Sequence, residues 1–202
     1  MCYFITGVDI GLHNMGIVKC KIVDDKIYSI EHFELIDLYK YKHIYSETEL
    51  HMFISNLCDE YSELFNSKYI LIERQPPGGL IAIQEVIAYI FKDKVHKISP
   101  RSVHSKLGIS FYNYENRKIK SEEIMKTFLI DNKQHEQLEI YNKLTRKHDV
   151  SDAFCLIKYF INHFLYVPIK QKNKINLTYD IDNFFKTFEF MNTKCTLKMV
   201  EG

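Results

Sequence analysis

The N-terminal run ITGVDIG, residues 5–11, constrains the fold more than any other stretch, because it places a carboxylate at the end of an apolar segment. The residues before Asp9 favour a buried strand, and Gly7 and Gly11 allow other backbone or a ligand to come close. A buried carboxylate needs a charge partner or a metal ion. Asp9 is therefore either an ordinary capping residue at a strand end or the first acid of a functional site.

The length and composition of the chain predict a single globular domain of generous size. The 202 residues are 46% hydrophobic and 26% charged, which is ordinary for a soluble protein with one sizeable core. Five scattered cysteines form no CxxC pair, so we expect reduced thiols. No secretory signal or membrane-spanning run is visible, and we expect an intracellular protein with no membrane partner.

The order of apolar patterns along the chain predicts an α/β fold. Three antiparallel strands are expected within residues 3–35, followed by a helix over 47–65 with apolar residues at helical spacing. A buried strand over 69–72 is followed by a glutamate and the loop RQPPGG. A helix over 80–91 and a short strand over 95–98 complete this half.

Two more helices are expected in the second half of the chain. The first begins at Ser121 and ends near Asn132, and the polar residues 133–147 predict a loop or a frayed helix. The second, written HDVSDAFCLIKYFINHF, carries two aspartates three positions apart, which project from the same face. We expect residues 1–167 to form one domain and residues 168–202 an extension whose packing the sequence does not indicate.

Four acids stand at the ends of these core elements: Asp9 and Glu73 on strands, and Asp149 and Asp152 on the last helix. Carboxylates gathered in a site of low dielectric repel one another unless cations neutralise them. Hard oxygen ligands without histidine or cysteine favour Mg²⁺, with Mn²⁺ as a substitute. Two such ions about 3.5–4 Å apart clamp the attacking water and the leaving oxygen in phosphodiester hydrolysis.

Residues 92–120 concentrate positive charge inside a chain whose formal net charge is only +1. They hold eight basic residues and two acidic ones, which indicates either a solvated surface or a phosphate-binding face. Phe111, Tyr112 and Tyr114 in this stretch are available to stack on bases. The residues expected to contact DNA are Arg74, Arg101, Lys106, Arg117, Lys118 and Lys120.

Taken together, these motifs resemble the RuvC-type Holliday junction resolvases of the ribonuclease H-like nuclease superfamily, and most closely their poxvirus branch. The resemblance covers residues 3–165 and depends on GVDIG, LIERQPP, ISPRSVHSKLG and HDVSDAF, which occur in the family's order. It implies a five-stranded mixed sheet between helices and a magnesium-dependent endonuclease that acts as a homodimer on four-way DNA junctions. For the poxvirus branch it also implies processing of concatemeric viral DNA in the host-cell cytoplasm.

The resemblance also implies roles for single residues. Asp9 matches the metal ligand on the first strand, Glu73 the acid on the fourth strand, and the aspartates of HDVSDAF the pair on the final helix. The family keeps a catalytic lysine near the scissile phosphate, with which Lys120 aligns best and Lys118 is the alternative. Apart from the resemblance, the position of His148 favours a surface residue at the helix start over the alternative of a catalytic role. The RQPPGG loop is shorter than the corresponding loop of bacterial relatives, which bears on junction selectivity.

Three other functions fit parts of the same pattern. A generic structure-selective nuclease of branched DNA would need the same acids and metal ions. A non-catalytic nucleic-acid binder would use the basic stretch, but carboxylates that face a polyphosphate oppose binding unless metals bridge them. An actin-like ATPase also places GVDIG against phosphate, yet needs two such domains, so we expect no nucleotide cofactor.

A homodimer is expected because two symmetric nicks need two active sites and one chain holds a single set of acids. The best candidate for the interface is the helix over 80–91, whose apolar residues spread around much of its circumference. The alternative is a helix buried within its own domain. The expected interface residues are Ile83, Val86, Ile87 and Ile90.

Overall fold

The computed structural model describes residues 1–38 and 50–165. The start of the helix expected over 47–65 and the extension expected over 168–202 lie outside the described residues. Among the helices that are described, none is long and apolar enough to cross a lipid bilayer.

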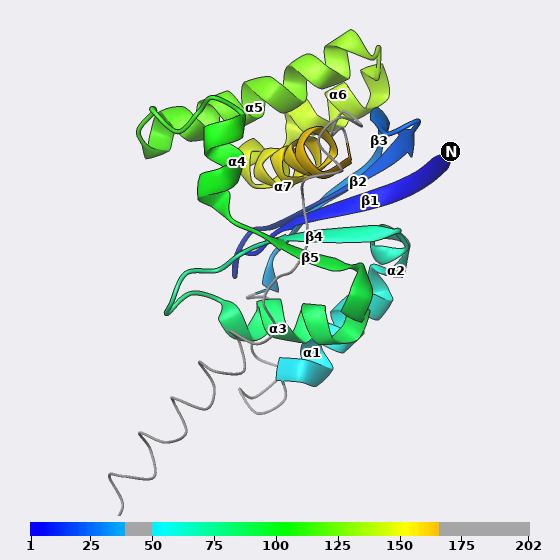
Figure 1. Cartoon of the computed structure of the whole chain (residues 1–202), viewed down its shortest axis with the longest axis vertical. Helices are drawn as coiled ribbons and strands as arrows, with labels where there is room; N and C mark the ends of the chain where they lie inside the picture. Colours follow the sequence, from blue (N-terminus) through cyan, green and yellow to red (C-terminus); the bar gives the residue numbers. More distant parts are fainter. Residues whose placement is uncertain (39–49, 166–202) are drawn as a thin grey trace, which may run out of the picture. The chain divides into compact units, whose positions relative to one another are not determined.

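A five-stranded mixed sheet forms the centre of the fold (Figure 1). β1 (Cys2–Asp9), β2 (Met15–Val23) and β3 (Lys26–Ile36) pair antiparallel, while β4 (Tyr69–Glu73) and β5 (Val95–Ile98) continue the sheet in parallel on the other side of β1. The strand order is β3-β2-β1-β4-β5. The predicted α/β fold and five-stranded mixed sheet are confirmed.

Helices cover both faces of this sheet (Figure 1). On one face lie α1 (Leu50–Glu60), α2 (Ser62–Phe65) and α3 (Ile81–Phe91). On the other face α7 (Lys147–Phe160) packs directly against the strands, and three further helices pack around it. These are α4 (Pro100–Lys106), α5 (Tyr114–Asp131) and α6 (His135–Lys143), and short helical turns at Lys92–Lys94 and Ile161–Leu165 follow α3 and α7.

Strands β1 and β4 end side by side under α7. Val8 of β1 is paired with Ile72 of β4, so the next residues, Asp9 and Glu73, follow at the same edge of the sheet. Val8 and Ile72 are buried in the cluster on the α1 and α3 face. Because side chains alternate along a strand, Asp9 and Glu73 project toward the opposite face, which α7 covers.

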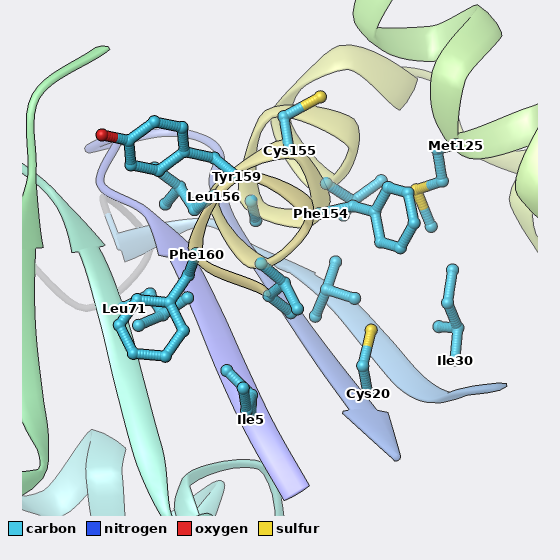
Figure 2. Packing of buried hydrophobic residues seen from close by; sticks show 14 of the residues in the cluster. Ile5, Cys20, Ile30, Leu71, Met125, Phe154, Cys155, Leu156, Tyr159 and Phe160 are labelled. Carbon is cyan, nitrogen blue, oxygen red and sulfur yellow. The ribbon is translucent and has the colours of Figure 1, made fainter. Parts of the chain in front are cut away.

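The larger hydrophobic cluster lies between α7 and the sheet (Figure 2). Phe154 of α7 points toward Met125 of α5, as Figure 2 shows. The Phe160 ring lies with its centroid 5.3 Å from that of Tyr69 on β4. The helix is thereby anchored along its length, and its first turn emerges at the edge of the sheet where Asp9 and Glu73 end.

Helix α5 begins earlier than the expected start at Ser121. Asn113 precedes the first turn, and its side-chain oxygen accepts a hydrogen bond from the Asn116 backbone N–H at 2.9 Å. This is a regular N-cap, so the helix has no need of a second one at Ser121. The Ser121 hydroxyl instead donates to the Lys118 carbonyl at 3.0 Å, within the helix.

Helix α6 forms where a loop or frayed helix was expected. Tyr141 is fully buried, its ring meets Phe33 edge-on at 6.3 Å, and its hydroxyl lies 2.9 Å from that of Ser151. Just before the helix, the Gln134 side chain accepts a hydrogen bond from the Ile30 N–H of β3 and donates one to the Ile30 carbonyl, both at 2.9 Å. Tertiary contacts rather than local propensity stabilise this segment.

Part of the dimer interface that was expected on helix α3 faces the core of the same chain. Ile83 and Ile87 are only 4% and 1% exposed and belong to the core on the α1 face. Val86 and Ile90 are partly buried against the same cluster. The expectation for Ile83 and Ile87 is therefore corrected, because side chains buried within one chain do not form a surface patch.

Two glycines let α7 approach the sheet closely. A Cβ atom on Gly7 would overlap the carbonyl oxygen of Ala153, and one on Gly16 would overlap the carbonyl oxygen of Asp149. Only glycine leaves room for helix backbone at these positions of β1 and β2. The close approach sets the height of Asp149 above the sheet.

We predict that Gly16→Ala lowers the free energy of unfolding by about 1–3 kcal/mol, the usual cost of inserting a methyl group into close-packed structure. Urea denaturation measures this change. Lys21→Ala on the same strand is the control, since Lys21 is not fully buried and its truncation should change stability by less than about 0.5 kcal/mol. Equal denaturation midpoints for Gly16→Ala and the wild type would contradict the close contact.

Candidate active site

The four acids singled out in the sequence line one cavity of about 190 Å³. Asp9 and Glu73 reach it from the ends of β1 and β4, and Asp149 and Asp152 from the first two turns of α7. Within the described parts of the chain, no three acidic, histidine or cysteine side chains are already arranged as a metal-binding cluster. The cavity therefore gathers the acids without presetting a coordination shell.

Burial and the charges of neighbouring carboxylates raise the proton affinity of two of the four acids, Asp9 and Asp152. The pKa of Asp9 is raised well above its ordinary value, first by burial, then by its hydrogen bond with Glu73 and by the charges of Glu73, Asp152 and Asp149. Burial is also the main reason why the pKa of Asp152 rises to about 7, and the polar side chain of Ser121 nearby opposes that rise. Both carboxyl groups favour a proton, or another cation, over bare negative charge.

The donor set fits a hard divalent cation. All four candidate ligands are carboxylates, which are the ligands that Mg²⁺ and Mn²⁺ prefer. A cation among them would take the place of the protons that Asp9 and Asp152 retain because their pKa values are raised, and it would relieve the repulsion between the acids.

Arg146, which the sequence did not single out, supplies positive charge at the edge of this cavity. Its Nε donates to Asp149 Oδ2 at 2.9 Å, and its Nη2 donates to His148 Nε2 at 3.0 Å. When the Asn14 amide is oriented so that its nitrogen and its oxygen each have a hydrogen-bond partner, the oxygen accepts a further hydrogen bond from Arg146 Nε at 3.2 Å. Arg146 immediately precedes α7 and Asp149 lies in its first turn, so their spacing of three residues in the sequence is the signal that could have indicated this ion pair.

His148 lies at the cavity rather than on the open surface. Its side chain is 15% exposed, with Nε2 3.4 Å from Asp149 Oδ1 and Nδ1 3.8 Å from Glu122 Oε1. Burial lowers its pKa, and the neighbouring Asp149 charge works in the opposite direction. The expectation of a surface role is wrong, because the first turn of α7 is covered by α5.

Lys118, and not Lys120, lines the cavity with the acids. The Lys118 Nζ lies 4.0 Å from the centre of the Tyr114 ring and 3.4 Å from Glu115 Oε1. Lys120 is not among the residues that line the cavity, and its Nζ pairs with Glu123 Oε2 at 2.6 Å. Side chains two positions apart on a helix point in directions that differ by about half a turn, so only one of the two lysines can face the acids.

The remaining basic residues are divided between two cavities and helix α4. Arg117 lines the acid cavity, and Arg101 and Lys106 are exposed on α4, whose His104 also lines that cavity. Arg74 is exposed and lines a separate cavity of about 450 Å³ together with Lys92, His96 and Lys97. The structure thus brings Arg117 and Lys118 to the acids and leaves Arg74 apart from them.

Comparisons with known proteins identify relatives of this fold. The sequence model of the family described as Poxvirus A22 protein matches residues 3–163. No curated protein sequence shows significant similarity to the chain.

Solved structures resemble the fold over most of the chain. Fowlpox virus resolvase in complex with its substrate Holliday junction DNA superimposes with a TM-score of 0.60 at 19% identity, over 79% of this chain and 97% of that one. A second structure of the Fowlpox virus Holliday junction resolvase gives a TM-score of 0.58 at 18% identity, over 79% and 98% of the two chains. The yeast mitochondrial Holliday junction resolvase gives 0.57 at 19% identity, over 78% and 77%. At these identities the likeness shows a common fold.

We predict that the protein loses stability as pH rises from about 4 to about 7 when divalent cations are chelated. The folded state keeps the Asp152 proton up to a pKa of about 7, whereas the unfolded chain releases it near the ordinary value of 3.8. A carboxyl group with a raised folded-state pKa stabilises the fold below its unfolded pKa, and this contribution is lost as pH rises through the folded value. Thermal unfolding should show a Tm lower by roughly 5–10 °C at pH 8 than at pH 5.

Asp152→Asn should flatten part of this pH dependence, since the amide does not titrate. Asp131→Asn, at an exposed position on α5, is the matched control and should retain the wild-type slope. Adding Mg²⁺ should raise the Tm more at pH 8 than at pH 5, because the carboxylates are then free of protons. If Tm depends on pH in the same way in the wild type and in Asp152→Asn, Asp152 does not cause this pH dependence.

Proposed function

Because this chain belongs to the Poxvirus A22 protein family, we propose that it is a metal-dependent endonuclease that resolves four-way DNA junctions by paired, symmetric nicks. The observation that carries the proposal is the gathering of four carboxylates from three core elements in one cavity, beside Lys118 and Arg117. The common fold with resolvases of Fowlpox virus and yeast mitochondria supports it. As a poxvirus-family protein, it would act on concatemeric viral DNA in the cytoplasm of the host cell.

The carboxylates would hold the metal ions of this reaction. Asp9, Glu73, Asp149 and Asp152 are the ligands we propose for two Mg²⁺ ions, with Mn²⁺ as a substitute. The chemistry that such ions would supply between these carboxylates is activation of a water molecule and stabilisation of the charge that develops on the phosphodiester oxygens. Arg146 donates a hydrogen bond to Oδ2 of Asp149, which keeps that carboxylate oriented at the start of α7.

The basic residues beside the acids would bind the DNA backbone. Lys118 and Arg117 lie within the cavity lining, where they can contact the phosphate group to be cut. Arg101 and Lys106 on α4 would contact neighbouring phosphates, since both are exposed. Such contacts position the substrate but carry no sequence information.

We propose a homodimer for the same reaction, because one chain supplies a single set of four acids and a symmetric junction needs two nicks. On α3 the inward packing of Ile83 and Ile87 leaves a different surface for contact. Its exposed large apolar residues are Ile81 and Tyr89, which are 39% and 78% exposed.

The decisive experiment compares cleavage of four-way, three-way, flap and linear duplex DNA of matched sequence in Mg²⁺. We expect the four-way junction to be cut fastest, with two nicks on opposing strands, by a species that sediments as a dimer. Asp152→Asn should lower cleavage by at least about 10²-fold through loss of one metal ligand while junction binding persists.

Two outcomes would redirect the proposal. Equal cleavage of all branched substrates would favour the alternative, a generic structure-selective nuclease. A monomer that makes both nicks in a single encounter would exclude the dimer.

We also predict that Lys118→Ala lowers the rate of cleavage by about 10²-fold, whereas Lys120→Ala changes it less than about twofold. The two lysines are a matched pair, since both lie on α5 and each pairs with a glutamate three positions away. Single-turnover cleavage at saturating protein measures the difference independently of affinity. The reverse order of effects would assign the phosphate contact to Lys120.

A further inference from the structure

The loop between α4 and α5 carries the most exposed large apolar side chain of the described residues. Phe111 is 95% exposed, and its neighbours Tyr112 and Tyr114 are 41% and 61% exposed. Exposed apolar residues that occur singly are ordinary, but here three aromatic rings lie within four residues. Tyr114 also lines the acid cavity, so this aromatic loop, residues 109–114, borders the candidate active site.

The aromatic loop is held at both ends. Ile109 is buried, and its N–H donates to the His104 carbonyl at 2.9 Å. Arg117 Nη1 donates to the Tyr112 carbonyl at 3.0 Å, and Asn113 caps α5. The backbone on either side of Phe111 is thus fixed, and a ring presented on a fixed backbone loses little conformational entropy when it binds.

The charges around the loop suit a polyanion. Lys118 Nζ lies 4.0 Å from the centre of the Tyr114 ring, and Lys120 Nζ lies 5.9 Å from that of Tyr112. Rings interleaved with cations are typical of surfaces that bind single-stranded nucleic acid, where bases stack and phosphates pair with the cations. At 95% exposure the Phe111 ring is open to a base.

We propose that Phe111 stacks on an unpaired base at the branch point of the DNA and thereby favours branched over linear substrates. This inference depends on the proposed function. In linear duplex each base is covered by its neighbours on both faces, whereas a branch point exposes a base face beside the strand to be cut. The RQPPGG loop that follows Glu73 contains no aromatic residue. Of that loop and the aromatic loop, only the aromatic loop can therefore stack a side chain on a base.

The test measures affinity for a four-way junction and for linear duplex of matched sequence by fluorescence anisotropy, with Asp152→Asn present in every protein to prevent cleavage. Phe111→Ala should weaken junction binding by about 5- to 150-fold, the range that one base–aromatic stack supplies. Duplex binding should change less than about twofold, because the phosphate contacts remain. Phe111→Trp should restore junction binding, and 2-aminopurine at the branch point should report the stack directly.

Tyr28→Ala is the matched control. Tyr28 is 62% exposed and has a lysine, Lys21, 5.4 Å from its ring, but it lies at the other end of the sheet from Asp9. Its removal should leave both affinities unchanged.

Three results would overturn the role of Phe111: unchanged junction affinity in Phe111→Ala, an equal loss on both DNAs, or a loss of dimer in sedimentation. The last would assign the ring to a second copy of the chain. A protein that cuts junctions selectively with or without Phe111 would reject this inference alone. A wild-type protein that neither prefers nor cuts junctions would reject it together with the proposed function.

Discussion

Repulsion among four carboxylates in one small cavity is the constraint on which the rest of the structure depends. Burial removes the water that would screen these groups, so the pKa of Asp9 and of Asp152 rises. Groups that repel one another remain together only when packing elsewhere stabilises the arrangement. Arg146 offsets part of the charge from within the chain, and the divalent cations of the proposed reaction would offset the rest.

Helix α7 links that packing to the site. Its apolar residues contribute to the larger core cluster, while its first turns supply two of the four acids. Gly7 and Gly16 allow its backbone to lie directly on β1 and β2. The acids on α7 and the acids on the strands are therefore held by the same contacts that stabilise the domain, and a change in the core beneath α7 is also a change in the site.

The sequence predicted the parts of the site that depend on local patterns. The positions of the acids at the strand ends can be predicted from the apolar runs that precede them. Two acids three positions apart on a helix lie on the same face whatever packs around that helix. The choice between Lys118 and Lys120 could not be made, because it depends on how α5 is rotated against α7. Tyr141 was missed because its burial comes from residues far away in the sequence. An isoleucine such as Ile87 suits a core as well as a protein interface, so the sequence pattern could not distinguish the two. Its burial in the core cluster on the α1 side of the sheet shows that it belongs to the core.

The paired hydrogen bonds between Gln134 and Ile30 bear on how two such chains can associate. β3 is an edge strand, and its free N–H and C=O groups would otherwise be a template for a strand from another molecule. The Gln134 amide takes up one N–H and one C=O of that edge, as a neighbouring strand would. A strand from another molecule is thus prevented from pairing with the middle of β3, and the sheet cannot be extended along the whole of this edge.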